Sequence, residues 1–237
     1  MKTYTYTAQF TAPHPDKLVP AILVQGGFKT PEQANDAMHR KAEEMARRVL
    51  SLPAPRSIIS QHPFVSSGNG VLKVSSAVLK SAKLYHLTQH YESPAGISVF
   101  VATLGHGFDR EMKKIMEGSM LESLFLDAAG SVLIEHYVGL IEEEVKRRFA
   151  TEGLEASLRF SPGYCDWETG QGQKALFSLI DAESIGVKIN EYGMMTPIKS
   201  VSGIILGAGR ISHRTPCPYC GKQDCPHRRE SRSDTVV

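Results

Sequence analysis

Hydrophobic and polar positions follow two different periods along this chain. Residues 3–10 alternate with a period of two, which predicts a strand, and the β-branched and aromatic residues at 96–105 predict a buried strand. From Ser119 to Phe149 the apolar positions recur at helical spacing, which predicts one long helix. These three segments carry the clearest signals of secondary structure in the chain.

The remaining segments give weaker signals. Thr30 and Gln33 have the spacing of a capping box around Pro31, so we expect a helix to begin there. The other expected elements are, in chain order, a loop containing Pro13, Pro15 and Pro20, the end of the Thr30 helix before Pro53, irregular or strand-like structure over 57–73, a helix over 74–90, a short helix over 109–117 with Asp109 as its N-cap, a strand over 157–160, a helix over 174–181, and paired strands over 186–192 and 198–207. Helices and strands are mixed without a regular βαβ alternation, which favours the α+β class.

The composition is that of an ordinary soluble globular protein, with 41% hydrophobic and 22% charged residues. No apolar run approaches the roughly 18 residues of a membrane span. The N-terminus lacks the apolar core of a signal peptide, so we expect a cytoplasmic protein without membrane contact. The net charge of +2 gives no reason to expect nucleic acid as a partner.

Basic residues and cysteines are concentrated near the C-terminus. Residues 210–232 carry six basic side chains against two acidic ones, and three of the four cysteines lie there too. We therefore divide the chain into a globular body over 1–209 and a basic Cys/His tail over 210–237.

One carboxylate interrupts the apolar face of the long helix. A buried carboxylate is costly unless it is paired or hydrogen-bonded. Glu135 therefore either forms a structural ion pair or is exposed by a rotation of the helix. The third alternative is that its carboxylate is held in a pocket for a cationic ligand or a neighbouring Arg. The other positions on this face are Leu121, Phe125, Ala128, Val132 and Gly139.

The segment Arg159–Tyr164, with the sequence RFSPGY, places an arginine at a strand end before a Pro-Gly turn. Gly163 permits a close approach between the backbone and a ligand. Arg159 has the fork geometry that binds a carboxylate through two hydrogen bonds, and Tyr164 adds a ring and a hydroxyl. The same residues are also compatible with an ordinary turn that carries a surface Arg.

The tail has the spacing C-x2-C-x4-C-x-H, formed by Cys217, Cys220, Cys225 and His227. Three Cys and one His suit tetrahedral zinc, although a single residue between the last two ligands is tight for one ion. An iron–sulfur cluster normally uses four Cys, and a redox or disulfide role or an unliganded tail are further alternatives. Cys165 stands apart in the sequence and is expected to be a packing residue or a bystander.

Motifs of common enzyme classes are absent from the sequence. It contains no G-x-G-x-x-G, no Walker A pattern and no G-x-S-x-G elbow. Nothing therefore indicates an independent hydrolase or dehydrogenase.

The stretch 159–204 resembles the activation domain of cobalamin-dependent methionine synthase in motif, order and spacing. It carries R-x-x-P-G-Y, then a helix, then a strand ending in a Glu, then S-V-S-G at 200–203. Residues 95–105 and the long helix through Glu135 also fit that family. The first 55 residues match only loosely, and the resemblance covers about 1–209 without the tail. It implies a single domain with a twisted, mainly antiparallel sheet and flanking helices.

The resemblance also implies a ligand and a function. The family binds S-adenosylmethionine in a shallow site against a cobalamin carried by another domain, and it restores methylcobalamin from cob(II)alamin with one electron and a methyl transfer. Arg159 matches the Arg that holds the methionine carboxylate, and Ser161 and Gly163 match loop positions whose backbone contacts the ligand. Tyr164 matches the Tyr of the motif, and Glu135 matches the ligand-side Glu of the long helix. The implied cofactors are S-adenosylmethionine and partner-borne cobalamin, with zinc a candidate for the tail.

Two departures from the family shape the expected function. Ile204 and Ile205 stand where larger members have aromatic residues, one of which touches the ligand, so we expect a weaker affinity or an altered pose. The chain also has no cobalamin-binding D-x-H-x-x-G segment. We therefore expect a module that acts in trans on a corrinoid protein or a truncated methionine synthase, with an electron donor such as a flavodoxin or ferredoxin. As an enzyme it would be a component of that methyltransferase; the alternative is a non-catalytic scaffold that keeps the fold and recruits a partner through its Cys/His tail.

Overall fold

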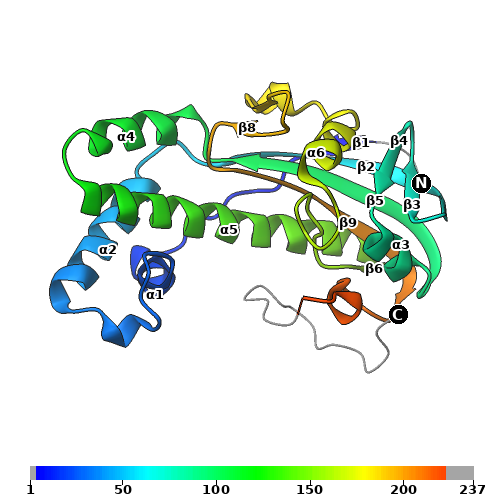
Figure 1. The fold of residues 1–237 in the computed structure, drawn as a ribbon, viewed down its shortest axis with the longest axis horizontal. Helices are drawn as coiled ribbons and strands as arrows, with labels where there is room; N and C mark the ends of the chain where they lie inside the picture. The colour runs from blue at the N-terminus through cyan, green and yellow to red at the C-terminus, as the bar shows by residue number, and fades with distance from the viewer. Residues whose placement is uncertain (1–3, 223–237) are drawn as a thin grey trace.

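The computed structural model describes residues 4–222, and at its centre lies a twisted, seven-stranded antiparallel sheet (Figure 1). The strand order is β4-β3-β2-β5-β9-β6, and β1 pairs with β2 over residues 59–61. The strands are β1 (Tyr4–Tyr6), β2 (Arg56–Gly68), β3 (Val71–Val74), β4 (Ala77–Lys80), β5 (Tyr91–Thr103), β6 (Glu155–Ala156) and β9 (Ser200–Ile211), with a separate ribbon of β7 (Lys188–Ile189) and β8 (Met195–Thr196). The α+β class and the mainly antiparallel sheet are confirmed.

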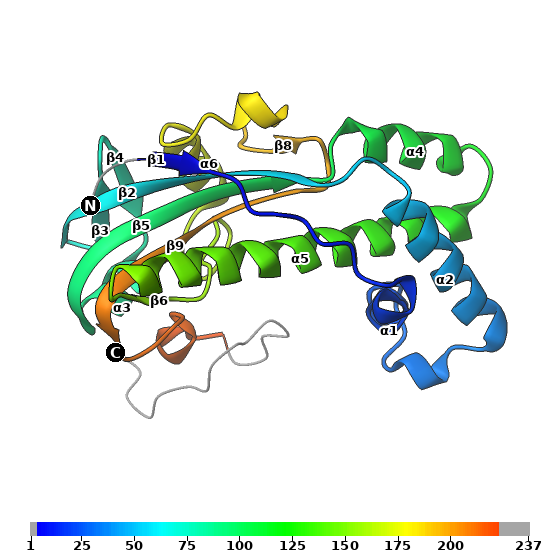
Figure 2. The ribbon, with the colours of Figure 1, turned by 180° about the vertical axis from the view of Figure 1, so that it is seen from behind.

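The helices lie on both sides of this sheet (Figures 1 and 2). The long helix α5 runs along one face, and α1, α2 and α4 gather at one end of it. On the other face, α3 and α6 contribute to a second core. The helices are α1 (Pro15–Gln25), α2 (Asp36–Leu50), α3 (Ala82–Thr88), α4 (His106–Met116), α5 (Met120–Thr151) and α6 (Thr169–Phe177), with short 3-10 turns η1 (Pro31–Gln33), η2 (Ala182–Ile185) and η3 (Cys217–Tyr219).

Strand β5 shows why the sheet has two cores. Successive side chains of a strand point to opposite faces. Phe100 and Ala102 therefore join the core beneath α5, whereas Val99 and Val101 join the core on the opposite face. All four are fully buried, so both faces of the sheet are covered at its centre.

Helix α5 is long and apolar enough, by length and composition, to cross a membrane. In its most apolar 18-residue window, 56% of the window is buried inside the protein. Phe125, Leu133 and Phe149 of this helix belong to the core that it forms with the sheet and with α1, α2 and α4. Packing in the core therefore explains its apolar composition.

The expected proline-containing loop is wrong, because residues 15–25 form the helix α1. Pro15 occupies the first turn, where its missing N–H costs nothing. Leu18, Ile22 and Leu23 are buried in the core, and this burial offsets the internal hydrogen bond that Pro20 cannot make.

Other boundaries also differ from the sequence expectations. Thr30 makes no cap bond: it precedes only the 3-10 turn η1, and α2 begins after Asn35, whose side chain accepts from Met38 N–H at 3.0 Å. The differences elsewhere are that 77–80 form a strand before α3, that α6 begins at Thr169, that Gly105 rather than Asp109 is the N-cap of α4, and that β9 pairs with β5 rather than with 186–192. Strand β9 also runs through Ile211, across the division that we predict at residue 209.

Candidate functional site

Arg159 lies where the edge of the sheet meets the long helix. Its neighbour Phe160 bridges to Ile204 of β9 through two backbone hydrogen bonds of 2.8 Å. The backbone N–H of Arg159 donates to Glu142 Oε1 at 3.1 Å, and its Nη2 donates to Glu135 Oε2 at 2.5 Å. Helix α5 therefore holds Arg159 through two carboxylates that lie about two turns apart.

The Arg159 side chain is buried, with only 6% exposed, although it carries a charge. Its Nε and Nη1 atoms have no hydrogen-bond partner among residues 4–222, since a Glu142 oxygen at 3.9 Å from Nε is too distant. Burial opposes the charge, but the Glu135, Tyr164 and Glu142 side chains outweigh it and hold the pKa of Arg159 above its ordinary value. A buried, permanently charged guanidinium with unused donors suits an anionic ligand.

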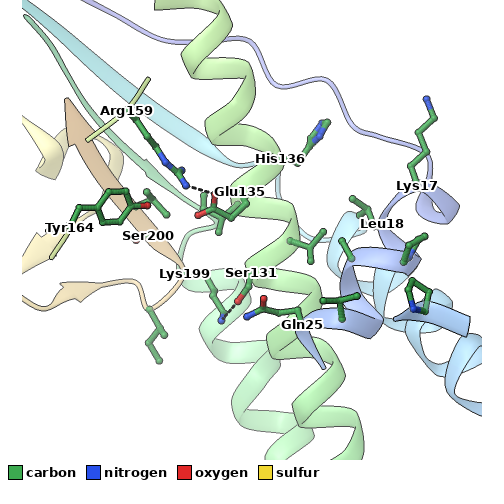
Figure 3. A pocket seen from close by; sticks show the side chains of 18 residues that line it. Lys17, Leu18, Gln25, Ser131, Glu135, His136, Arg159, Tyr164, Lys199 and Ser200 are labelled. Atoms are coloured by element: carbon green, nitrogen blue, oxygen red, sulfur yellow. Dashed lines mark hydrogen bonds and ion pairs between the residues drawn. The ribbon is translucent and has the colours of Figure 1, made fainter. Parts of the chain in front are cut away.

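Glu135 differs from the expected buried carboxylate, because 51% of its side chain is exposed. It lies at the edge of the apolar face of α5, where it pairs with Arg159 and also lines a cavity (Figure 3). The ion pair thus joins a buried cation to a carboxylate that a ligand can reach.

The turn after Arg159 is closed by its own backbone. Gly163 has φ +94°, a left-handed conformation that favours glycine, and its N–H donates to Trp167 C=O at 2.7 Å. Tyr164 N–H donates to Ser161 C=O at 3.0 Å, and the Phe160 and Trp167 rings stack with centroids 5.4 Å apart. The motif loop, which we define as 159–167, is therefore a rigid unit.

A cavity of about 1020 Å³ opens in front of this loop (Figure 3). Glu135, Arg159 and Tyr164 line it together, and they come from α5 and from the motif loop. Leu18 and Gln25 of α1 line it from the opposite side. Three of the five predicted ligand residues are therefore assembled at one cavity.

Ser161 and Gly163, the other two, are not among the residues that line this cavity. Ser161 is buried, and its Oγ has no hydrogen-bond partner within the described part of the chain. Gly203 lets this serine approach β9, because a Cβ at position 203 would lie 2.8 Å from Ser161 Oγ. In this structure both residues shape the turn, and their contact with a ligand stays a prediction.

Lys199 and Ser200 also line the cavity, although Lys199 is not among the predicted site residues. Lys199 Nζ lies 2.8 Å from Asp127 Oδ1 and donates to Ser131 Oγ at 2.8 Å, both on α5. One residue earlier, the N–H of Ile198 donates to the Asp109 carboxylate at 3.2 Å. These bonds fix the start of β9 at the cavity, and none of them has a local sequence signal.

Ile204 and Ile205 are fully buried and do not line the cavity. Ile204 belongs to the core on the α6 face, and Ile205 belongs to the core beneath α5. Their aliphatic character therefore serves packing in this chain.

The predicted metal residues fall partly outside the described part of the chain. Cys217 and Cys220 are described, whereas Cys225 and His227 lie outside residues 4–222. Within those residues no three His, Cys, Asp or Glu side chains are grouped so that they could hold a metal ion. The tail site therefore stays a prediction.

Comparisons with known proteins address the family and the fold. Residues 85–213, more than half of the chain, match the family described as "Vitamin B12 dependent methionine synthase, activation domain". The fold is similar to a solved structure titled "Crystal Structure of the MetH Reactivation Domain bound to AdoHcy", with a TM-score of 0.64 and 14% sequence identity over 91% of this chain and 81% of that one. No curated protein matches the chain.

Proposed function

Because this chain belongs to the family of vitamin B12-dependent methionine synthase activation domains, we propose that its cavity binds S-adenosylmethionine for the reactivation of a cobalamin. S-adenosylmethionine supplies an activated methyl group, and cobalamin is carried by a partner. The matched region includes α5, the motif loop and the start of β9, which are the elements that form the polar side of the cavity.

One observation carries this proposal: Arg159 is a buried cation that lines the cavity, and two of its donor nitrogens have no partner within residues 4–222. The carboxylate of the methionine part of the ligand fits these donors through charge-assisted hydrogen bonds. Glu135 holds Nη2 in place and leaves the rest of the guanidinium for the ligand. Arg159 therefore binds and orients the ligand and takes no part in proton transfer.

Two further side chains complete the binding site in this proposal. The half-exposed carboxylate of Glu135 faces the positive charges of the ligand, its ammonium and sulfonium groups. Tyr164 is 39% exposed and contacts the Phe160 ring edge-on at 6.0 Å, which holds its ring at the cavity wall. The contribution of the chain is then mainly the positioning of the methyl donor.

The cobalamin partner in this proposal is a separate corrinoid protein or a truncated methionine synthase in the cytoplasm. These 237 residues contain no D-x-H-x-x-G segment that would bind cobalamin. Ile198 lines the cavity and is 69% exposed, so an apolar surface lies where a partner would cover the ligand. A flavodoxin or ferredoxin is the class of electron donor that this chemistry requires.

Calorimetric titration with S-adenosylmethionine tests the proposal. Arg159→Ala removes one or two charge-assisted bonds, worth roughly 2–3 kcal/mol, which corresponds to an affinity loss of about 30- to 150-fold. Arg147→Ala is the matched control, because Arg147 also pairs with a carboxylate of α5, that of Glu144, but is 66% exposed and does not line the cavity. Equal affinity in the wild type and Arg159→Ala would refute the assignment of the pocket.

A second titration covers the case in which the isolated chain binds nothing. Repeating it with a corrinoid protein loaded with cob(II)alamin supports the proposal if binding then appears and depends on Arg159. If neither titration shows binding, the alternative of a non-catalytic scaffold replaces this proposal.

A further inference from the structure

The segment 155–160 forms an outer edge of the sheet, beside β9. Strand β6 is the last in the strand order, and Phe160 exchanges two backbone hydrogen bonds of 2.8 Å with Ile204 of β9. Along a strand, the N–H and C=O groups of successive residues point to opposite sides. Because Phe160 directs both of its groups toward β9, the N–H of Arg159 points away from β9. The sheet therefore supplies no acceptor for that N–H, and another element must do so.

The acceptor is a carboxylate of the long helix. The N–H of Arg159 donates to Glu142 Oε1 at 3.1 Å. Only 18% of the Glu142 side chain is exposed, and Glu142 does not line the cavity. A buried N–H without an acceptor is costly, so this bond fixes the backbone of Arg159 beside α5.

The same oxygen of Glu142 also faces the side chain of Arg159. It lies 3.9 Å from Nε, which is too far for a hydrogen bond but close enough for an attraction between opposite charges. Glu135, two turns earlier on α5, accepts a hydrogen bond from Nη2 instead. The two carboxylates therefore face two different nitrogens of one cation.

This arrangement keeps donors of Arg159 available for a ligand. A guanidinium and a carboxylate favour a bidentate pair, in which two parallel N–H groups donate to the two oxygens. If Glu142 did not attract the Nε side, Arg159 could form such a pair with Glu135 and use the donors that a ligand carboxylate needs. In the structure this pair is not formed, since Nε and Nη1 have no hydrogen-bond partner within residues 4–222.

We propose that Glu142 is a positioning residue of the ligand site, which holds Arg159 so that its guanidinium binds the ligand carboxylate and does not close on Glu135. Glu142 acts through Arg159 and does not touch the ligand. The inference rests on the proposed function, because it concerns how Arg159 recognises the carboxylate of S-adenosylmethionine. It adds a residue that lies outside the motif at 159–164.

The test compares two ligands on the full chain by calorimetry, S-adenosylmethionine and its decarboxylated analogue. Glu142→Ala should lower the preference for S-adenosylmethionine by at least about tenfold, the equivalent of one charge-assisted hydrogen bond to the carboxylate. A merely structural role would weaken both ligands alike and leave the preference unchanged. The ratio of two affinities measured on one sample also does not depend on how much of the variant is folded.

Two further variants sharpen the test. Glu142→Gln keeps a side-chain oxygen that can accept from the Arg159 N–H, so its preference should stay within about threefold of the wild type. Glu143→Ala is the matched control on the same helix, because Glu143 is 72% exposed and pairs only weakly with Lys146, at 3.6 Å. It should leave the affinities for both ligands unchanged.

The outcomes separate this inference from the proposed function. If the wild type binds S-adenosylmethionine and Glu142→Ala keeps the wild-type preference, the role of Glu142 is refuted and the proposed function stands. A Glu142→Gln variant that loses as much preference as Glu142→Ala would refute positioning through the backbone bond. If the wild type binds neither ligand, alone or with the corrinoid protein loaded with cob(II)alamin, the proposed function fails and this inference fails with it.

Discussion

The two walls of the cavity differ in how they are built. One wall consists of α5, the motif loop and the start of β9, lies within the family match at 85–213, and carries the charges of Arg159 and Glu135. The other wall is α1, lies outside that match, and faces the cavity with Leu18 and Gln25. Charge and shape are therefore separable here: the first wall carries the buried cation and its carboxylate partner, and the second encloses the cavity through side chains that pack on the core.

The largest expected effect comes from a substitution in the α1 wall that leaves the residues of the polar wall unchanged. Ile22 is fully buried between α1 and the core, so Ile22→Ala should lower the free energy of unfolding by about 2–5 kcal/mol. Val24→Ala, on the same helix, should stay within about 0.5 kcal/mol because Val24 is 48% exposed. Urea unfolding of both variants measures the difference, and equal losses would mean that α1 is not anchored through Ile22.

The next effect tests how tightly the helix of the polar wall is held. A Cβ at Gly130 would lie 2.4 Å from the Phe108 ring of α4, so Gly130→Ala should destabilise the protein by about 1–3 kcal/mol. At Gly139, also on α5, no atom lies within 4 Å of the added Cβ. Gly139→Ala should therefore stabilise the protein by up to about 1 kcal/mol. Thermal unfolding checks the pair, and a loss of stability in both variants would contradict the packing of α4 on α5.

A smaller effect compares a charge on each wall. Lys17 lines the cavity from α1 but is exposed, so Lys17→Ala should change S-adenosylmethionine affinity by less than about 1 kcal/mol, or about fivefold. Added salt should remove even this change. A loss as large as that of Arg159→Ala would show that α1 takes part in recognition.

The smallest expected effect is a pH dependence that acts on the stability of the fold and not on ligand binding. Desolvation lowers the pKa of His62, and a hydrogen bond to Leu179 C=O only partly opposes this. The pKa of His62 in the folded protein lies below the ordinary value of 6.5. The stability that depends on a neutral His62 is therefore present above pH 6.5 and is lost as the pH falls below it. Ligand binding at Arg159, which stays charged, should not follow this dependence.

His62→Gln provides the measurement. Unfolding free energies of the variant and the wild type between pH 5 and pH 7.5 should differ most in slope below pH 6.5. Identical slopes would mean that His62 does not contribute to the acid sensitivity of the fold.

The sequence predicted the parts of this molecule whose signals are local. The helical periodicity predicted a helix from about Ser119 to Phe149, and α5 spans Met120–Thr151, with Ser119 as an N-cap that accepts from Glu122 N–H at 3.3 Å. Arg159 and Tyr164 belong to one motif of six residues, so their proximity in space followed from their proximity in the sequence. Glu135 was selected because a carboxylate on an apolar face needs a partner.

The parts that the sequence did not predict depend on contacts between distant segments. The pairing of β9 with β5 is decided by packing on both faces of the sheet, which no turn signal encodes. Helix α1 was obscured by its two prolines, because the cost of Pro20 inside the helix is offset by burial of α1 in the core.

The most direct test of the central claim uses a pair of ligands. The wild type and Arg159→Ala are each titrated with S-adenosylmethionine and with its decarboxylated analogue. If Arg159 binds the carboxylate, the wild type should prefer S-adenosylmethionine by about 30- to 150-fold, and Arg159→Ala should bind the two ligands equally. An Arg159→Ala variant that keeps the wild-type preference would contradict the account.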